Sequence, residues 1–380
     1  MKLKVKNIYF FSVPFGRSIS NLNINLSRHV VVTISNGSKE GIGEGVLYRG
    51  TSLNAIFLYK EIFKPFIEDN KFISLESARN EIFKELAHIN PGITSAFDLA
   101  LWDLEAKVKN MSLHQLLKAT KNKLFITEEM FLDNLNREHL SEINKHGTRH
   151  LKIKIEQETI NNWQNINQVL NNFRGEVRTD ANRAFSLKDF SKFRLVLRKL
   201  KINEIEEPLK ENDIMKLEDK SGIILDESVL SLDDLKKYLK NGFKMFNLKF
   251  SRLGGITACR KYQKEIEKWG GQIVIGCSEE LGIATHAQLV FAASITSLHS
   301  IEGLGSERLK FDIIKKPYSI KNGKVSLNSK VKFSEKRLID ASRKFHFPVS
   351  VNAKLSPAFV LFEIRENIKG KLKNLWLRVN

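Results

Sequence analysis

The chain has 380 residues, 62 Lys and Arg against 43 Asp and Glu, and a formal net charge of +19. Its 42% hydrophobic and 28% charged residues are typical of a folded globular protein and exclude intrinsic disorder. The sequence has no apolar run near the roughly 20 residues that a membrane-spanning helix needs, and its two cysteines are too few for a disulfide framework. We therefore expect a cytoplasmic protein with no membrane partner.

The positive charge raises the question of nucleic-acid binding. Residues 330–380 hold 12 Lys and Arg against 4 Asp and Glu, and the rest of the excess is scattered along the chain. The sequence contains no zinc-finger, basic-zipper or RNA-recognition motif. A solvated basic surface is therefore the favoured interpretation, and we do not expect a nucleic-acid partner. A non-catalytic basic binding protein is the alternative from another functional class.

Residues 1–122 have the pattern of an α+β domain. Alternating glycines over 41–45 mark a third extended segment, after two predicted strands. The predicted strands are 3–11 and 29–34, and the predicted helices are 53–67, 75–88 and 95–109.

Residues 123–325 alternate between strand and helix patterns. The eight predicted strands are 126–131, 150–155, 177–181, 204–206, 222–226, 244–249, 272–277 and 298–302. Amphipathic segments such as 186–200, 232–239 and 256–269 lie between them. This repeat predicts a closed parallel α/β barrel, and the absence of a glycine-rich phosphate motif disfavours a nucleotide-binding sheet. Residues 326–380 are predicted to return to the first domain.

Ionisable side chains stand at the carboxyl ends of five consecutive predicted strands, where barrel enzymes carry their chemistry. They are Lys152, Lys154, Asp180, Glu206, Asp226 and Lys249. The alternation of a strand places Lys152 and Lys154 on the same inward face. One such residue alone is more often a helix cap or a solvated charge. Five strands in succession indicate a functional site.

The residue types indicate a reaction. Asp180, Glu206 and Asp226 on neighbouring strands suit a hard divalent cation, Mg²⁺ with Mn²⁺ as the alternative. Lys154 and Lys249 are four strands apart, so they face each other across the barrel mouth and could remove a proton on one side and return it on the other. Partial burial and the like charge of Lys152 both favour the neutral amine that a base requires. The cation would stabilise the enolate formed when a proton α to a carboxylate leaves.

Several motifs resemble those of the enolase superfamily, in its muconate-lactonizing subgroup. They are Lys152-Ile153-Lys154, Asp180-Ala181-Asn182, Ile205-Glu206-Glu207-Pro208, Asp226-Glu227-Ser228 and Asn247-Leu248-Lys249. The resemblance implies a modified (β/α)7β TIM-type barrel with an N-terminal α+β capping domain. It also implies one Mg²⁺, two acid/base lysines among the catalytic residues Lys152, Lys154 and Lys249, and a small-molecule carboxylate substrate. Association into a homo-oligomer is expected for barrels of this kind.

The eighth strand departs from one pattern of this subgroup. Dipeptide epimerases carry Asp-x-Asp there, whereas this chain has Ser300-Ile301-Glu302. Glu302-Gly303-Leu304-Gly305 is similar to the corresponding stretch of muconate cycloisomerases. Racemisation or epimerisation of an amino-acid derivative or dipeptide is the first interpretation, because it needs only two opposed lysines. A muconate-type cycloisomerase and an o-succinylbenzoate synthase-type dehydratase are the alternatives.

A further set of residues is predicted to contact the substrate. The set consists of Asn182, Glu280, Ser300, Glu302, Arg17 and Arg49. Glu280 or Glu302 could contact a cationic substrate, orient a lysine or form a structural salt bridge. Arg17 and Arg49, in loops of the capping domain, could bind a distal carboxylate or lie on the surface.

Overall fold

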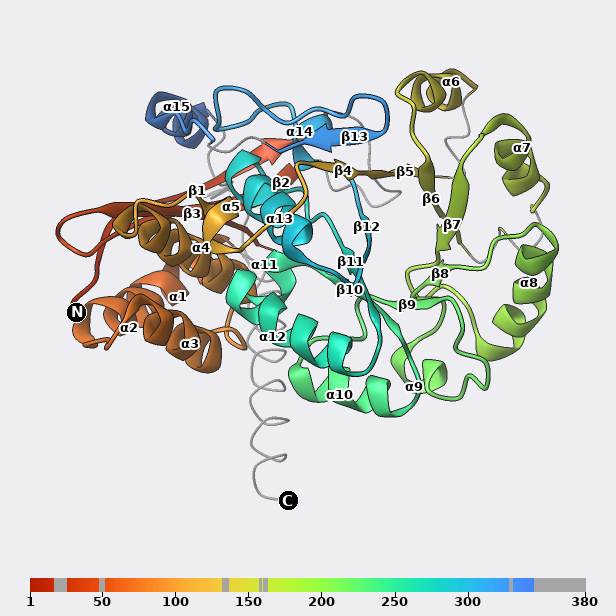
Figure 1. The fold of residues 1–380 in the computed structure, drawn as a ribbon, viewed down its shortest axis with the longest axis horizontal. Helices are drawn as coiled ribbons and strands as arrows, with labels where there is room; N and C mark the ends of the chain where they lie inside the picture. Colours follow the sequence, from red (N-terminus) through yellow and green to blue (C-terminus); the bar gives the residue numbers. More distant parts are fainter. Residues whose placement is uncertain are drawn as a thin grey trace, which may run out of the picture.

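The computed structural model describes residues 1–16, 26–47, 52–131, 137–156, 159, 163–327 and 331–344. These residues form an N-terminal antiparallel sheet with its own helices beside an eight-stranded parallel barrel (Figure 1). This is the mixed α/β architecture predicted from the sequence.

The N-terminal part, here called the cap, contains a three-stranded meander covered by helices. Its strands pair in the order β1-β2-β3, antiparallel throughout. The elements are β1 (Lys4–Pro14), β2 (Leu26–Ser35), β3 (Glu40–Val46), α1 (Ser52–Leu58), the π-helical turn η1 (Tyr59–Phe63), α2 (Lys64–Asp69), α3 (Leu75–Leu86), α4 (Pro91–Val108) and α5 (Leu113–Leu116). The helix predicted over 53–67 is therefore present but contains a π turn.

The alternating glycines of β3 allow the strand to lie directly on α4. A Cβ atom on Gly41, Gly43 or Gly45 would lie 2.0 Å from a backbone carbonyl oxygen of α4. Side chains at these positions would therefore separate the sheet from the helix. Helix α4 also begins four residues before its predicted start, because Asn90 accepts a hydrogen bond from the Ile93 backbone N–H and Pro91 suits the first turn.

All eight predicted barrel strands are present. They are β5 (Thr127–Phe131), β6 (His150–Lys154), β7 (Glu176–Asp180), β8 (Ile205–Glu206), β9 (Ile223–Leu225), β10 (Met245–Leu248), β11 (Gln272–Ile275) and β12 (Leu298–Ile301). Neighbours pair in chain order from β5 to β12. A parallel bridge between Thr127 and Glu302, with the Gly303 N–H donating to the Thr127 carbonyl at 2.9 Å, joins the first strand to the end of the last.

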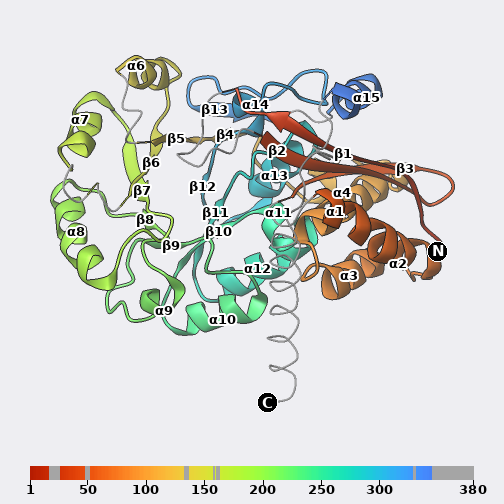
Figure 2. The same cartoon turned by 180° about the vertical axis from the view of Figure 1, so that it is seen from behind.

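Helices follow most of these strands on the outside of the barrel (Figure 2). They are α6 (Arg137–Lys145), α7 (Gln164–Asn172), α8 (Leu187–Lys199), α9 (Glu211–Ile214), α10 (Leu232–Lys240), α11 (Phe250–Leu253), α12 (Ile256–Lys268), α13 (Gly282–Ser294) and α14 (Gly305–Arg308). In the described part of the chain, no helix is long and apolar enough to cross a membrane.

Two buried carboxylates of the cap hold it to the barrel. Asp98 on α4 accepts a hydrogen bond from the Thr257 N–H at 3.0 Å, in the first turn of α12. Glu44 on β3 accepts from the Leu281 N–H at 2.6 Å and the Ala284 N–H at 3.0 Å, at the start of α13. Negative groups at helix N-termini are favourable, so the cap completes helices that carry no capping side chain of their own.

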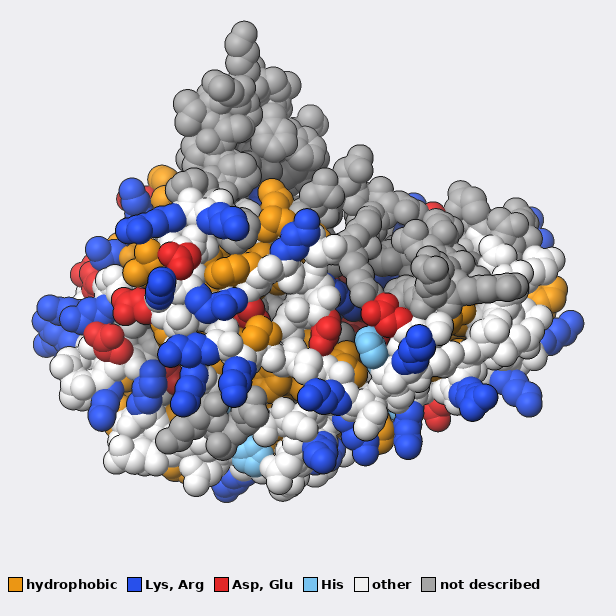
Figure 3. Space-filling model, turned by 90° about the horizontal axis from the view of Figure 1, so that it is seen from above, with side chains coloured by type: hydrophobic (Ala, Val, Ile, Leu, Met, Phe, Trp, Pro, Cys, Tyr) orange, Lys and Arg blue, Asp and Glu red, His pale blue; other side chains and the backbone are white. Residues whose placement is uncertain are grey.

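Described elements after the last barrel strand lie against both parts. Strand β13 (Lys324–Ser326) pairs with β4 (Lys123–Phe125), and α15 (Glu335–Lys344) buries Leu338 in one cluster with Phe11 of the cap. The predicted domain limits, 1–122, 123–325 and 326–380, stay predictions, and residues 345–380 lie outside the described part. Lys and Arg side chains are spread over the face shown in Figure 3.

Candidate active site

Three carboxylates end three neighbouring strands, as predicted. Asp180 is the last residue of β7, Glu206 is the last residue of β8, and Asp226 directly follows β9. Asp180 and Glu206 are paired in register, and all three side chains are buried. Strand β8 stops after Glu206 because Glu207 has a φ of +39° and Pro208 cannot donate to a sheet.

Lys152 lies at the bottom of the barrel mouth, here called the floor, with 1% of its side chain exposed. Burial disfavours its ammonium, but attraction to the surrounding carboxylates outweighs this and raises the pKa of Lys152 well above its ordinary value. Its Nζ forms ion pairs with Glu302 at 2.7 Å, Glu129 at 2.9 Å, Asp180 at 3.3 Å and Glu206 at 3.4 Å. Lys152 is therefore a fixed cation whose charge is shared among four acids.

Lys154 and Lys249 lie at the more exposed edge of the barrel mouth, here called the rim, and reach the carboxylates from the two ends of the row. Lys154 Nζ lies 3.8 Å from Asp180 Oδ2 and 3.5 Å from Asn182 Oδ1. Lys249, the N-cap residue of α11, places its Nζ 2.9 Å from Asp226 Oδ2. Their side chains are 25% and 16% exposed, so both amines are more accessible than that of Lys152.

Glu206 and Asp226 differ in how far nearby positive groups offset their negative charge. Burial, together with repulsion from Glu302, Asp180 and Asp226, raises the pKa of Glu206 well above its ordinary value. Burial also opposes ionisation of Asp226, but Arg252 and Lys249 outweigh it and lower the pKa of that carboxyl. Negative charge is thus less compensated at Glu206, in the middle of the row, than at Asp226.

The structure adds residues that the sequence analysis did not select. Arg178 donates to Glu302 at 2.7 Å, and the Asn247 amide donates to Glu206 at 2.9 Å and to Glu302 at 3.1 Å. Arg178 and Asn247 lie two residues before Asp180 and Lys249, so strand alternation could have identified them. Arg308, which lies 3.2 Å from Glu129, sits on α14 beyond the strands, where no pattern indicates it.

The predicted substrate residues occupy different places. Glu302 lies on the floor, where it holds both Lys152 and Arg178. Asn182 lies at the rim and donates to Glu227 at 2.9 Å. Ser300 contacts Arg178 at 2.7 Å and lines a cavity at the opposite end of the barrel.

Glu280 points towards the boundary with the cap. Its buried carboxylate accepts from the Ser278 N–H at 2.6 Å and from the Ser251 hydroxyl at 3.3 Å, and the Ser251 oxygen in turn accepts from the Val46 N–H of the cap at 3.0 Å. Burial raises the pKa of Glu280. Arg17 and Arg49 lie outside the described residues.

The predicted metal ligands fit a hard cation by their chemistry. All are buried carboxylates at one edge of the sheet, and the repulsion between Glu206 and its acidic neighbours, which raises the pKa of Glu206, is what a divalent cation would offset. Their oxygens engage lysine and arginine groups, and no set of three or more acidic, histidine or cysteine side chains in the described ranges is arranged to hold an ion. Binding of a cation would thus require these ion pairs to rearrange.

Comparison with known proteins assigns both parts of the chain to described families. Residues 135–331 match the family described as enolase C-terminal domain-like. Residues 11–118 match the N-terminal domain of mandelate racemase / muconate lactonizing enzyme.

Individual relatives carry several enzyme names. The chain is 27% identical over 357 residues to o-succinylbenzoate synthase of Bacillus subtilis (strain 168), covering 87% of this chain and 92% of that protein. It is 27% identical over 288 residues to L-Ala-D/L-Glu epimerase of Francisella tularensis subsp. novicida (strain U112), covering 70% and 80%.

Solved structures share the fold. Dipeptide epimerase from Methylococcus capsulatus, complexed with Mg and the dipeptide L-Arg-D-Lys, has a TM-score of 0.78 at 20% identity over 87% of this chain and 98% of that one. Muconate lactonizing enzyme from Klebsiella pneumoniae has a TM-score of 0.79 at 20% identity over 90% and 99%.

Proposed function

The chain belongs to the mandelate racemase / muconate lactonizing enzyme family of the enolase superfamily, and we propose that it is a divalent-cation-dependent isomerase that removes the proton α to a substrate carboxylate. One observation carries the proposal. Lys154 and Lys249 approach the row of buried carboxylates from opposite ends. Members of this superfamily are enzymes, so the alternative of a non-catalytic binding protein is not retained.

The two rim lysines would exchange a proton with the substrate. A neutral amine on one side takes the α-proton, and the ammonium on the other side supplies a proton to the opposite face. Lys154 and Lys249 lie on β6 and just after β10, four strands apart, which suits opposite faces of one substrate. Lys152 would remain charged and hold the surrounding acids in place.

Asp180, Glu206 and Asp226 would hold the cation. When bound, Mg²⁺ or Mn²⁺ would offset the negative charge that develops on the substrate carboxylate as the α-proton leaves. Beneath the substrate carboxylate, the buried ion pairs of Lys152 and Arg178 with Glu302 would keep charged groups in fixed positions.

Racemisation or epimerisation of an amino-acid derivative or dipeptide is the outcome we propose first. It needs only the two opposed lysines, and several relatives bear epimerase names. The o-succinylbenzoate synthase name of the Bacillus subtilis relative keeps dehydration, and the muconate lactonizing structures keep cycloisomerisation, as alternatives for the same residues. Cytoplasmic location and a homo-oligomeric state stay predictions.

The test is proton NMR in D₂O with Mg²⁺ over dipeptides, N-acyl amino acids and muconate. The α-proton signal of a substrate should disappear with the wild type. Lys154→Ala and Lys249→Ala should each lose roughly 10²- to 10⁴-fold in rate, because each removes one acid/base group. Lys236→Ala, on the exposed face of α10, serves as the control and should exchange normally.

The other outcomes separate the alternatives. A new product without α-exchange would favour cycloisomerisation or dehydration. Equal exchange by wild type and both rim variants would contradict the two-base assignment. Absence of both turnover and Mg²⁺ binding would contradict the proposed function.

A further inference from the structure

Gly276 lies beside the side chain of Lys249 at the carboxyl end of the barrel. It directly follows β11, whose last residue pairs with Leu248, the residue before this lysine. A Cβ atom on Gly276 would lie 2.5 Å from Lys249 Cε and 2.7 Å from Lys249 Cγ. Carbon atoms in contact are normally about 3.5 to 4 Å apart. The lysine stem therefore occupies the space that a side chain at position 276 would need.

The backbone of Gly276 is fixed on both sides. Its N–H donates to the Leu248 carbonyl at 3.0 Å, and its carbonyl accepts from the Gln288 side chain at 3.4 Å. Gly276 is not among the glycines with a positive φ, so its backbone conformation does not itself require glycine. The lack of a side chain matters here because of the space in front of this backbone.

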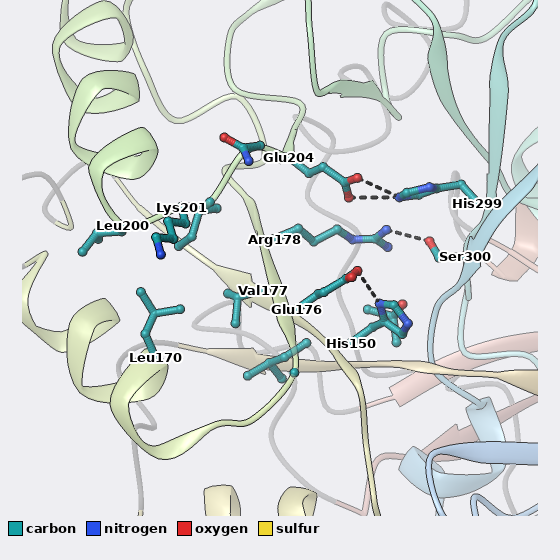
Figure 4. Close-up of a pocket in the computed structure, with 15 residues that line it drawn as sticks. His150, Leu170, Glu176, Val177, Arg178, Leu200, Lys201, Glu204, His299 and Ser300 are labelled. Carbon is teal, nitrogen blue, oxygen red and sulfur yellow. Dashed lines mark hydrogen bonds and ion pairs between the residues drawn. The ribbon is translucent and has the colours of Figure 1, made fainter.

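Asn247 is the second neighbour of this glycine, and its amide is held in place. A Cβ atom on Gly276 would lie 2.3 Å from Asn247 Oδ1. Asn247 Nδ2 donates to Glu206 at 2.9 Å and to Glu302 at 3.1 Å. Glu302 in turn accepts at 2.7 Å from Arg178, which lines a cavity at the amino end of the barrel (Figure 4). The amide cannot turn its oxygen away from Gly276 without losing these hydrogen bonds.

Lys249 is the neighbour that can yield, because its stem is a flexible chain of four carbons. Displacing the stem would carry its Nζ away from Asp226 Oδ2, which lies 2.9 Å from it. We propose that Gly276 is a positioning residue for Lys249: without a side chain, it leaves open the path along which the amine reaches the carboxylate row. The inference rests on the proposed function, in which Lys249 serves one face of the substrate.

A double-variant cycle tests the steric relation without turnover. Gly276→Ala should lower the Tm, because the added methyl group meets the Lys249 stem. Adding Lys249→Ala to this variant should give a Tm change that is roughly 2 °C or more above the change it causes in the wild type. Gly271→Ala, at the other end of β11, is the matched control, since a Cβ atom there would lie 2.8 Å from Ile266 and from the Lys244 carbonyl. Its combination with Lys249→Ala should be additive.

Exchange of the α-proton in D₂O tests the positioning role. A substrate found by NMR is supplied as each of its two stereoisomers at the reacting carbon, and Lys154→Ala and Lys249→Ala show which lysine each one needs. Gly276→Ala should slow the stereoisomer that needs Lys249 by about 10²-fold, because a displacement of about 1 Å can cost that much. The stereoisomer that needs Lys154 should exchange near its wild-type rate. Gly271→Ala should exchange both as the wild type does.

Three results would overturn the proposal. They are an additive Tm cycle at position 276, unchanged exchange of both stereoisomers, and equal slowing of both, which would place the effect on Asn247 and Glu206. If Gly276→Ala does not fold, recovery of folded protein by Lys249→Ala supports the proposal, and failure to recover it counts against it. Absence of exchange by the wild type would contradict the proposed function, and the Tm cycle would still decide whether Gly276 shapes the path of Lys249.

Discussion

The floor and the rim of the barrel mouth use the same residue type in different surroundings. On the floor, Lys152 is 1% exposed and has four carboxylates within 3.4 Å. At the rim, Lys154 and Lys249 are 25% and 16% exposed and face the ends of the carboxylate row. The difference shows that position along the strand decides whether a lysine is buried among carboxylates or stays partly accessible at their edge.

The largest stability effect should come from the floor. Lys152→Met would leave several buried acids without their shared cation, and we expect it to lower the free energy of unfolding by about 3 to 5 kcal/mol. Lys154→Met, two residues along the same strand, should cost about 1 kcal/mol or less, because Lys154 is partly solvated. Urea denaturation measures both, and equal losses would remove the distinction between floor and rim.

The carboxylate row should respond to metal. At a Mg²⁺ concentration 100 times its Kd, binding to the native state should stabilise the protein by about 2.7 kcal/mol, and addition of a chelator should reverse this. Asp226→Asn should greatly reduce the Mg²⁺-dependent rise in Tm, whereas Glu211→Gln on α9 should retain it. An unchanged rise in Asp226→Asn would exclude this residue as a ligand.

The boundary between cap and barrel offers a smaller test, because Asp98 is buried there without an ion pair among the described residues. Burial raises the pKa of Asp98 from 3.8 to about 6, despite hydrogen bonds from Thr257 that lower it. The native state therefore binds more protons than the unfolded chain between these values. Stability from this group must fall as the pH rises, by about 1 kcal/mol between pH 5 and pH 7.

Asp98→Asn should remove this contribution, since an amide oxygen can still accept from the Thr257 N–H without burying a charge. The free energy of unfolding at the two pH values, measured for Asp98→Asn and the wild type, gives the comparison. Asp103→Asn, at a more exposed position on the same helix, is the matched control. An identical pH dependence in Asp98→Asn and the wild type would show that Asp98 is not the group responsible.

The strands and the rim residues could be predicted because both depend on local pattern. Eight short strands alternate with amphipathic helices, and polar residues at period two, such as Lys152 with Lys154, follow from strand geometry. The same alternation could have revealed Arg178. It could not have revealed Arg308, whose contact with Glu129 joins a short helix after β12 to the first barrel strand.

The sequence by itself determined the order of the elements, the barrel and the row of acids between two lysines, because these follow from periodicity and from the end of each strand. Only the tertiary structure decided which charges are compensated. It placed four acids around Lys152, directed Glu280 towards Ser251 and the cap, and left Arg178 Nε, in a cavity at the opposite end, without a hydrogen-bond partner among the described residues. The physical reason is that burial and charge pairing depend on distances between strands far apart in the chain, which local pattern does not specify.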